Sequence, residues 1–335
     1  MKKKVTMLDI ANIAGVSKAT VSMVINRKDE HISEETRNKV LKVADELDFI
    51  PDSVARSLAT NKSGTIGIIL PDITNPFFSE MARAIEDEAN NCGFNVIFCN
   101  SDNEIKKEKK YVELLISKRV DGVIFIAGGK SSGNIEILNS KGTPFVIVDR
   151  YCEEHNEYYG VYCRSREGVE NGIEYLYSIG KRKIAFVTGQ KGLEISRQRL
   201  AGYRYACKKR GIYNKEYVFQ GDYTLEGGIK ATEAILKFPE KFDTIFYSSD
   251  IAAFGGMKTL LRHGYKIPED IGIMGFDNIK ISQFIEPELT TIAQPIYEMG
   301  TESVKLLVKI ISGDNVTQKQ IFFKPQLVVR GTVKP

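Results

Sequence analysis

Eight short apolar segments constrain the fold of this chain more than any other feature. Each is nearly free of polar interruptions, which is typical of strands buried on both faces of a parallel sheet. Amphipathic stretches between them, such as residues 77–92 and 104–118, predict helices. The segments form two series of four, so we expect two doubly wound α/β halves with a cleft between them. They comprise residues 65–70, 95–99, 121–126, 144–149, 183–189, 217–222, 244–249 and 271–277.

A different pattern occupies residues 5–26, where two short helices are predicted on either side of a turn. Gly15 accepts the positive φ that a tight turn needs, and Ser17 is suited to cap the second helix. This arrangement is the geometry of a helix-turn-helix, in which the start of the second helix enters the major groove of DNA. An ordinary helical hairpin is the alternative. The predicted shared core is Ile10, Ala11, Ala14, Val21 and Val24.

A third helix is predicted to follow, and it makes the helical hairpin a weaker explanation. Ser33, followed by Glu34 and Glu35, is a typical helix start. Ile50-Pro51 is predicted to end this helix, and residues 52–58 are predicted to form one further helical segment. The apolar stripe of the third helix is Val40, Val43, Ala44 and Leu47.

The words LDIANIAGVSKATVSMVIN and ISEETRNKVLKVADELDFIPDSVARSLA closely resemble the lactose-repressor (LacI) family of transcriptional regulators, and the resemblance continues through the rest of the chain. It implies a λ-repressor-like helix-turn-helix over residues 1–50 and a hinge helix with linker over 51–64. Residues 65–335 would then be a periplasmic-binding-protein-like core for effector binding and dimerisation.

The resemblance also implies which residues contact DNA. Lys18 and Ala19 would read bases, and Thr20 and Ser22 would lie near phosphates. The hinge helix would fold when two copies meet on the operator, with Leu58 wedged into a minor-groove base step. Met23 stands where many members have Arg or His, and a thioether cannot make their contact to guanine. The full predicted set is Thr6, Ser17, Lys18, Ala19, Thr20, Ser22, Met23, Asn26, Ala55, Arg56 and Leu58.

Polar and aromatic side chains follow several predicted strands at their carboxyl ends, where open α/β sheets bind ligands. Carboxylates, guanidinium groups and amides bind sugar hydroxyls, and aromatic rings stack on sugar faces. Phe77 and Phe78 could instead be core, Asp277 a helix cap and Arg150 a surface ion-pair partner. By resemblance to periplasmic sugar-binding proteins, the effector site is Asn75, Phe77, Phe78, Asp149, Arg150, Arg199, Ser249, Asp277 and Gln294. Ser249 stands where pentose binders of this fold often have Asn, so the identity of the sugar stays open.

The family also implies three crossings between the two halves, near residues 164, 292 and 322. The N-subdomain would comprise residues 65–163 and 294–321, and the C-subdomain residues 164–293 and 322–335. The helix that begins at Ile296 would then belong to the first half, and the final strand to the second.

Composition and missing motifs argue against other functions. The net charge of +4 is mild, and five cysteines without C-x-x-C spacing argue against a disulfide framework or a zinc site. A phosphate loop, a dinucleotide fingerprint and a nucleophile elbow are all missing, so no enzyme and no cofactor are expected. No apolar run reaches the roughly 20 residues of a membrane span.

The sequence therefore predicts a cytoplasmic, homodimeric repressor that binds double-stranded operator DNA and whose affinity for it is controlled by a small sugar, a pentose or a hexose. Two alternatives keep the DNA binding and replace the sugar by a purine or a phosphoprotein. A sugar-binding receptor without a regulatory role is a further, weaker alternative.

Overall fold

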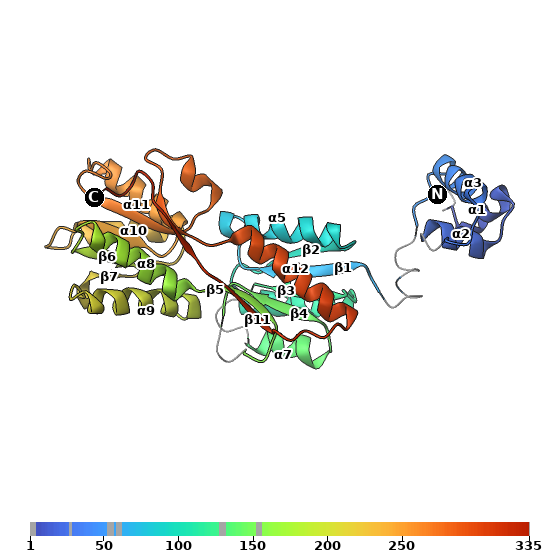
Figure 1. Ribbon diagram of the computed structural model, residues 1–335, viewed down its shortest axis with the longest axis horizontal. Coiled ribbons are helices and arrows are strands. Elements are labelled where there is room, and N and C mark those ends of the chain that lie inside the picture. Colours follow the sequence, from blue (N-terminus) through green and yellow to red (C-terminus); the bar gives the residue numbers. More distant parts are fainter. Residues whose placement is uncertain are drawn as a thin grey trace. The chain divides into compact units, whose positions relative to one another are not determined.

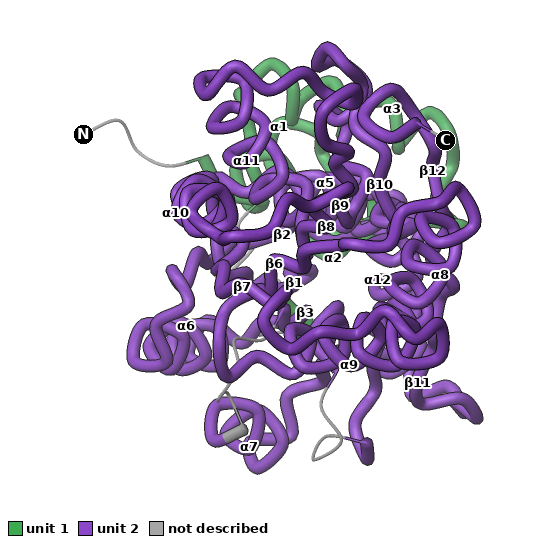
Figure 2. The backbone as a smooth tube through the Cα atoms, turned by 90° about the vertical axis from the view of Figure 1, so that its left-hand side faces the viewer, with its two compact units in different colours: residues 1–63 green, residues 64–335 purple. Residues whose placement is uncertain are grey.

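The computed structural model describes residues 5–26, 29–51, 57, 62–126, 132–151 and 156–334. The chain forms two compact units, residues 1–63 and residues 64–335 (Figure 2). Each unit has its own apolar core and is described by itself.

The first unit is a bundle of three helices: α1 (Met7–Ala14), α2 (Lys18–Ile25) and α3 (Glu34–Glu46). Gly15 ends α1 with φ 64°, and the Ser17 hydroxyl accepts a hydrogen bond from the Thr20 amide at the start of α2. Ser33 caps α3 in the same way. The predicted turn and both caps are thus confirmed. All five predicted core residues of α1 and α2 are buried, with Val40, Val43 and Ala44 of α3 packed against them.

The end of α3 was predicted too late. The helix ends at Glu46, four residues before Ile50, because Asp48 adopts a left-handed backbone conformation with φ 48° that no α-helix can continue through. The predicted hinge segment 52–58 lies outside the described residues, apart from Ser57.

The second unit contains two six-stranded sheets, each covered by helices on both faces. The first sheet has the order β11-β5-β4-β3-β1-β2. Helices α5 and α12 pack together on one face, and α6 and α7 cover the other (Figure 1). Its elements are β1 (Thr65–Leu70), α5 (Pro76–Asn91), β2 (Asn95–Asn100), α6 (Ile105–Ser117), β3 (Gly122–Phe125), α7 (Ser132–Ser140), β4 (Phe145–Val148), β5 (Gly160–Cys163), α12 (Ile296–Ser312) and β11 (Gln320–Phe323).

The second sheet has the order β12-β10-β9-β8-β6-β7, and only β12 runs antiparallel to its neighbour. Helices α8 and α9 cover one face, and α10 and α11 cover the other (Figure 1). Its elements are α8 (Ser165–Ser178), β6 (Ile184–Val187), α9 (Glu194–Lys209), η2 (Lys215–Tyr217), β7 (Val218–Phe219), α10 (Leu225–Leu236), β8 (Thr244–Tyr247), α11 (Asp250–Arg262), β9 (Gly272–Asp277), η3 (Lys280–Gln283), β10 (Thr290–Ala293) and β12 (Gln326–Val328).

All eight predicted strands are present, and the two doubly wound halves are confirmed. The predicted burial on both faces is wrong for β2, because this strand lies at the edge of its sheet and leaves Phe98 44% exposed. Four further strands, β5, β10, β11 and β12, were not among the eight. Each of them has three or four residues and lies outside the apolar segments from which the strands were predicted.

The chain passes between the halves at three places: from β5 to α8, from β10 to α12 and from β11 to β12. We call the half built on the first sheet the N-subdomain and the other the C-subdomain. Helix α12 packs on the N-subdomain although it follows β10 of the C-subdomain, and β12 returns to the second sheet. The predicted crossing near 322 falls inside β11, slightly before the observed passage.

Within the described part of the chain, no single helix is both long and apolar enough to cross a membrane. The pair α1 and α2 reaches that length and composition only when joined across a bend of 110°.

Candidate functional site

A cleft between the two subdomains collects most of the predicted effector residues. It encloses about 570 Å³ of space between the side chains, including space that is open to solvent. Because parallel strands of each sheet point their carboxyl ends toward it, loops from both halves supply its walls. The lining residues are Asp72, Asn75, Phe77, Phe78, Asn103, Asp149, Arg150, Gln190, Ile195, Arg199, Asp222, Tyr223, Thr224, Ser249 and Asp277.

Asp149 and Arg150 enter the cleft directly after β4. Asp149 is buried and adopts φ 69°, a left-handed conformation that Asp tolerates better than most residues. Its Oδ1 is buried without a hydrogen-bond partner among the described residues, and burial raises the pKa of this carboxyl. Arg150 reaches across to Asn103 Oδ1 at 3.1 Å and lies 5.6 Å from the centre of the Phe78 ring. Asp149 thus offers an unused acceptor next to a positioned guanidinium group.

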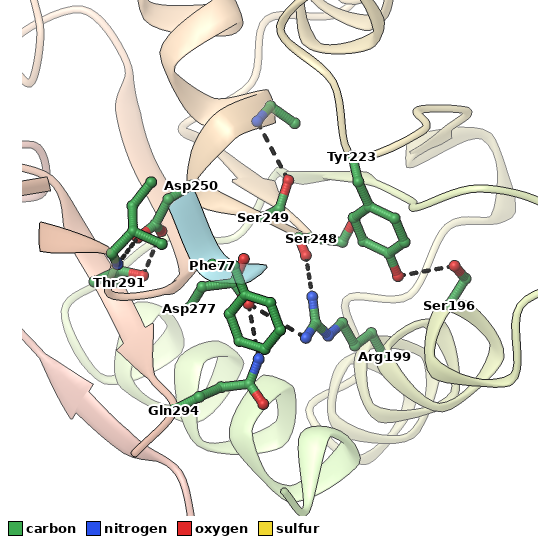
Figure 3. Close-up of polar contacts among 12 residues, drawn as sticks. Phe77, Ser196, Arg199, Tyr223, Ser248, Ser249, Asp250, Asp277, Thr291 and Gln294 are labelled. Atoms are coloured by element: carbon green, nitrogen blue, oxygen red, sulfur yellow. Dashed lines mark hydrogen bonds and ion pairs between the residues drawn. The ribbon is translucent and has the colours of Figure 1, made fainter. Parts of the chain in front are cut away.

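Arg199 of α9 is the buried cation of the C-subdomain wall. Its guanidinium donates to the Ser248 carbonyl and, through Nη2 at 3.4 Å, to Asp277 Oδ1 (Figure 3). The Phe276 ring lies 3.8 Å from the guanidinium carbon, and the Tyr223 ring lies on another side at 5.6 Å. Arg199 Nε is buried without a described partner, so the group keeps a donor available.

Asp277 ends β9 with φ 120°, a conformation that requires support from its surroundings. Burial raises its pKa to about 8, and the nearby Arg199 guanidinium acts in the opposite direction. Gln294 donates from Nε2 to Asp277 Oδ1 at 2.8 Å (Figure 3). Gln294 is not among the residues lining the cleft; it lines a separate hollow with Glu80 and Asn278. Its contribution to the cleft is therefore to hold Asp277.

Phe77 and Phe78 open α5 and form an edge-to-face pair with ring centres 5.2 Å apart. Both line the cleft, and both are also buried in the N-subdomain core, so a place in the core does not exclude a place in the cleft wall. Asn75 caps α5, its Oδ1 accepting the Phe77 amide at 3.0 Å. The amide nitrogen of Asn75 is the group left to face a ligand.

Ser249 caps α11, because its hydroxyl oxygen accepts the Ala252 amide at 3.2 Å. The hydroxyl proton remains able to donate into the cleft. A single hydroxyl donor at this position replaces the donor and acceptor that an asparagine would supply.

The structure adds residues to the cleft that the sequence interpretation missed. The most prominent is Tyr223, with φ 69° and its hydroxyl 2.8 Å from Ser196 Oγ (Figure 3). Asp222 and Thr224 flank it, and Gln190 and Asn103 come from other loops. Asp222 is the last residue of the predicted segment 217–222 that contains β7, and Tyr223 follows it, so the strand-end rule applied to that segment would have found both.

The first unit presents a second candidate site, the exposed start of α2. Ser17, Lys18, Ala19 and Met23 are exposed, whereas Val21 and Val24 of the same helix are buried. The helix thus turns one face to its core and the opposite face to solvent, as a groove-reading helix must.

The other predicted DNA contacts have local partners or lie outside the described residues. Thr6 caps α1 in a reciprocal pair with Asp9, and Thr20 Oγ1 lies 2.9 Å from Ser17 Oγ. Asn26 ends α2, its Nδ2 donating to the Ser22 carbonyl at 2.7 Å. Ala55, Arg56 and Leu58 lie outside the described residues.

The polar groups of the cleft are suited to binding. Four carboxylates and two guanidinium groups from both subdomains line it, and several donors and acceptors are uncommitted. No group of three or more His, Cys, Asp or Glu side chains suited to a metal ion occurs among the residues that the structure describes.

Both units of the chain match models of known protein families. The model of bacterial regulatory proteins of the lacI family matches residues 6–52, and that of periplasmic binding protein-like domains matches residues 173–333. The ribose operon repressor of Halalkalibacterium halodurans is 39% identical over 329 residues, which cover 98% of this chain and 97% of that protein.

Two solved structures are similar over most of the chain. The lac repressor dimer bound to operator and the anti-inducer ONPF gives a TM-score of 0.88 at 27% identity, covering 98% of this chain and 99% of the other. A lacI-family regulator from Enterococcus faecium with bound ribose gives a TM-score of 0.74 at 32% identity, covering 81% of this chain and 99% of the other.

Proposed function

The chain belongs to the lacI family of bacterial regulatory proteins, and on that premise we propose that it is a transcriptional repressor whose affinity for operator DNA is controlled by a small sugar. The effector is a free pentose, with ribose the first candidate, bound in the cleft between the subdomains. The protein acts in the cytoplasm as a homodimer, with one α2 helix in the major groove of each half-site.

The observation that carries the sugar proposal is the set of charged groups on both walls of the cleft. Asp149 and Arg150 come from the N-subdomain, and Arg199 and Asp277 from the C-subdomain. Sugar hydroxyls both donate and accept, so they can use the open Asp149 oxygen and the open Arg199 Nε at once. Phe77, Phe78 and Tyr223 supply the apolar ring faces.

The charge of the cleft favours a neutral ligand over a phosphorylated one. Asp72, Asp149, Asp222 and Asp277 face it, against the two guanidinium groups of Arg150 and Arg199. Burial raises the pKa of Asp277 to about 8, but even without that charge a phosphate would meet the carboxyl groups of Asp72, Asp149 and Asp222 in a partly desolvated space. We also propose that the protein is not an enzyme and needs no cofactor, because the donors and acceptors of the cleft are suited to holding hydroxyl groups and the relatives named above are repressors.

Sugar binding would be linked to DNA binding through closure of the two subdomains. A ligand that contacts both walls stabilises the closed arrangement relative to an open one. Coupling between sites in such proteins is typically about 1–3 kcal/mol, so the sugar would change operator affinity by roughly 5- to 150-fold. We propose that the sugar weakens operator binding.

The test is a thermal-shift screen of the full chain against D-ribose, other pentoses, hexoses, their phosphates and purines. We expect one free sugar to raise the melting temperature, and the rise should grow with the logarithm of the ratio of sugar concentration to Kd. Fluorescence anisotropy with an operator selected from a random DNA library then measures whether that sugar weakens DNA binding.

The screen also separates the alternatives. A purine that stabilises the protein would replace the sugar as effector. A flat result across all compounds, with operator binding intact, would favour a phosphoprotein partner. Sugar binding without any sequence-specific DNA binding would contradict the repressor proposal.

A further inference from the structure

The turn that follows Asp277 is held from both subdomains at once. Asp277 and Asn278 both have positive φ, 120° and 59°, and they lead into Ile279 and the short helix η3. Neither residue is glycine, so the turn is a costly conformation that persists only if its neighbours hold it. Since Asp277 is a cleft residue, whatever holds this turn also sets the position of an effector-binding carboxylate.

Part of that support comes from the C-subdomain itself. Asp250 is fully buried and accepts hydrogen bonds from the Ile279 amide at 3.0 Å and the Ser282 hydroxyl at 2.7 Å. Thr291 of β10 donates to the other Asp250 oxygen at 2.6 Å (Figure 3). Arg330 donates to Asn278 Oδ1 at 2.7 Å. These contacts all lie within the C-subdomain, so they hold one side of the turn independently of the position of the N-subdomain.

The other side of the turn is held by α5 of the N-subdomain. The Ile279 side chain, 1% exposed, lies in the same apolar cluster as Phe77, Phe78 and Met81 of α5. The Lys280 amide donates to Glu80 Oε1 at 2.8 Å, a bond between residues 200 positions apart in the sequence. Glu80 is on the same helix as the two phenylalanines that line the cleft, so α5 contributes both to the ligand wall and to this bond.

We propose that Glu80 is a positioning residue for effector binding, which fixes the turn at residues 277–280 only when the two subdomains are closed. Separation of the subdomains would withdraw the Glu80 carboxylate and the pocket for Ile279 together. Asp277 would then lose the support on one side of its unfavourable conformation. The proposal rests on the proposed function for the role of Asp277. The contacts of Glu80 and α5 with the turn, which we call the clamp, are nevertheless a property of the protein without ligand.

The first arm of the test measures the turn directly, by hydrogen exchange of the backbone amides of residues 279–284 in the ligand-free full chain. Glu80→Ala removes the acceptor, so exchange there should be about tenfold faster. Glu80→Gln keeps an Oε1 acceptor and should stay close to the wild type. Glu86→Ala, on the same helix but paired with Arg83, is the matched control and should change nothing in the turn. Unchanged exchange in Glu80→Ala would overturn the proposal.

The second arm measures coupling to the cleft through the dissociation constant for D-ribose, determined by calorimetry. Glu80→Ala should bind about tenfold more weakly, with Glu80→Gln restoring most of the affinity. Faster exchange with unaltered affinity would show that the clamp does not position Asp277, and would overturn the coupling. If the wild type does not bind D-ribose, the proposed effector is wrong, and the sugar found in the screen replaces ribose in this measurement. The hydrogen-exchange experiment still tests whether Glu80 holds the turn, because it uses the protein without ligand.

Discussion

Asp149 gives the sharpest prediction, because its substitution by Asn should change stability and sugar affinity in opposite directions. The carboxylate is buried, and one oxygen has no described hydrogen-bond partner in the ligand-free protein. Asn has the same shape, tolerates the same left-handed backbone conformation and carries no charge. Asp149→Asn should therefore relieve the cost of a desolvated, half-satisfied charge. It should also replace the charged acceptor that a sugar hydroxyl would use by a neutral amide oxygen, which is a weaker acceptor.

The two effects have comparable size. An unsatisfied buried polar group costs about 1–3 kcal/mol, and since the amide remains partly unsatisfied we expect a gain of about 1–2 kcal/mol in the free energy of unfolding. For a unit of the size of residues 64–335 that corresponds to a rise of about 2–4 °C in Tm. A hydrogen bond to a charged acceptor is worth about 1.5–3 kcal/mol and one to a neutral acceptor about 0.5–1.5 kcal/mol, so the exchange should weaken sugar binding by roughly 5- to 13-fold.

The pH dependence of unfolding is an independent test of whether Asp149→Asn stabilises the protein. Burial raises the pKa of Asp149 in the folded state above its ordinary value of 3.8. Below that value the carboxyl is protonated in both states, so the charge costs nothing and the two proteins should be equally stable. As pH rises, the unfolded chain ionises first and the wild type loses stability, so the advantage of Asp149→Asn should grow toward neutral pH.

The assay is thermal unfolding at pH 3 and pH 7, with calorimetric titration of the sugar found in the screen. Asp314→Asn, at an exposed aspartate after α12, is the matched control and should move Tm by less than about 1 °C. A lower Tm for Asp149→Asn at pH 7, or unaltered sugar affinity, would refute the reasoning.

Three further substitutions test the helix-turn-helix, the hinge segment and the effector cleft separately. Ser17→Ala removes the cap of α2 and should destabilise the first unit by about 1 kcal/mol, visible as faster amide exchange in α2 and weaker operator binding; unchanged exchange would contradict it. Leu58→Ala should weaken operator binding in an anisotropy titration while sugar affinity stays unaltered, and equal loss of both would argue against separate modules. Arg150→Ala should abolish the sugar response in the same titration and leave ligand-free operator affinity intact; a retained response would remove Arg150 from the effector site.

Local signals in the sequence predicted much of this protein correctly. Gly15 with φ 64° and the caps Ser17 and Ser33 follow from the chemistry of single residues and their immediate neighbours. The eight buried apolar segments predicted the two α/β halves for a similar reason, because a strand covered on both faces must be apolar along its length. Strand ends then placed Asp149, Arg150 and Asp277 near a common cleft, and the resemblance to sugar-binding proteins added Arg199 of α9.

Features that depend on distant parts of the chain could not be predicted from the sequence in this way. The end of α3 at Glu46 depends on the left-handed Asp48, and the weak segments β5 and β11 become strands only by pairing with each other beside β4. The sequence likewise does not indicate that Gln294 holds Asp277 from behind the cleft, or that Glu80 meets the Lys280 amide.

The two kinds of feature differ in predictability because they depend on interactions of different range along the sequence. Caps, turns and burial patterns depend on neighbours within a few positions, so the sequence by itself determined the modules, their secondary structure and the chemical character of the effector site. Which side chains meet across the cleft depends on how two separately folded sheets are joined by three crossings. Only the tertiary structure therefore decided which carboxylate is left without a partner and which contacts hold the two walls together.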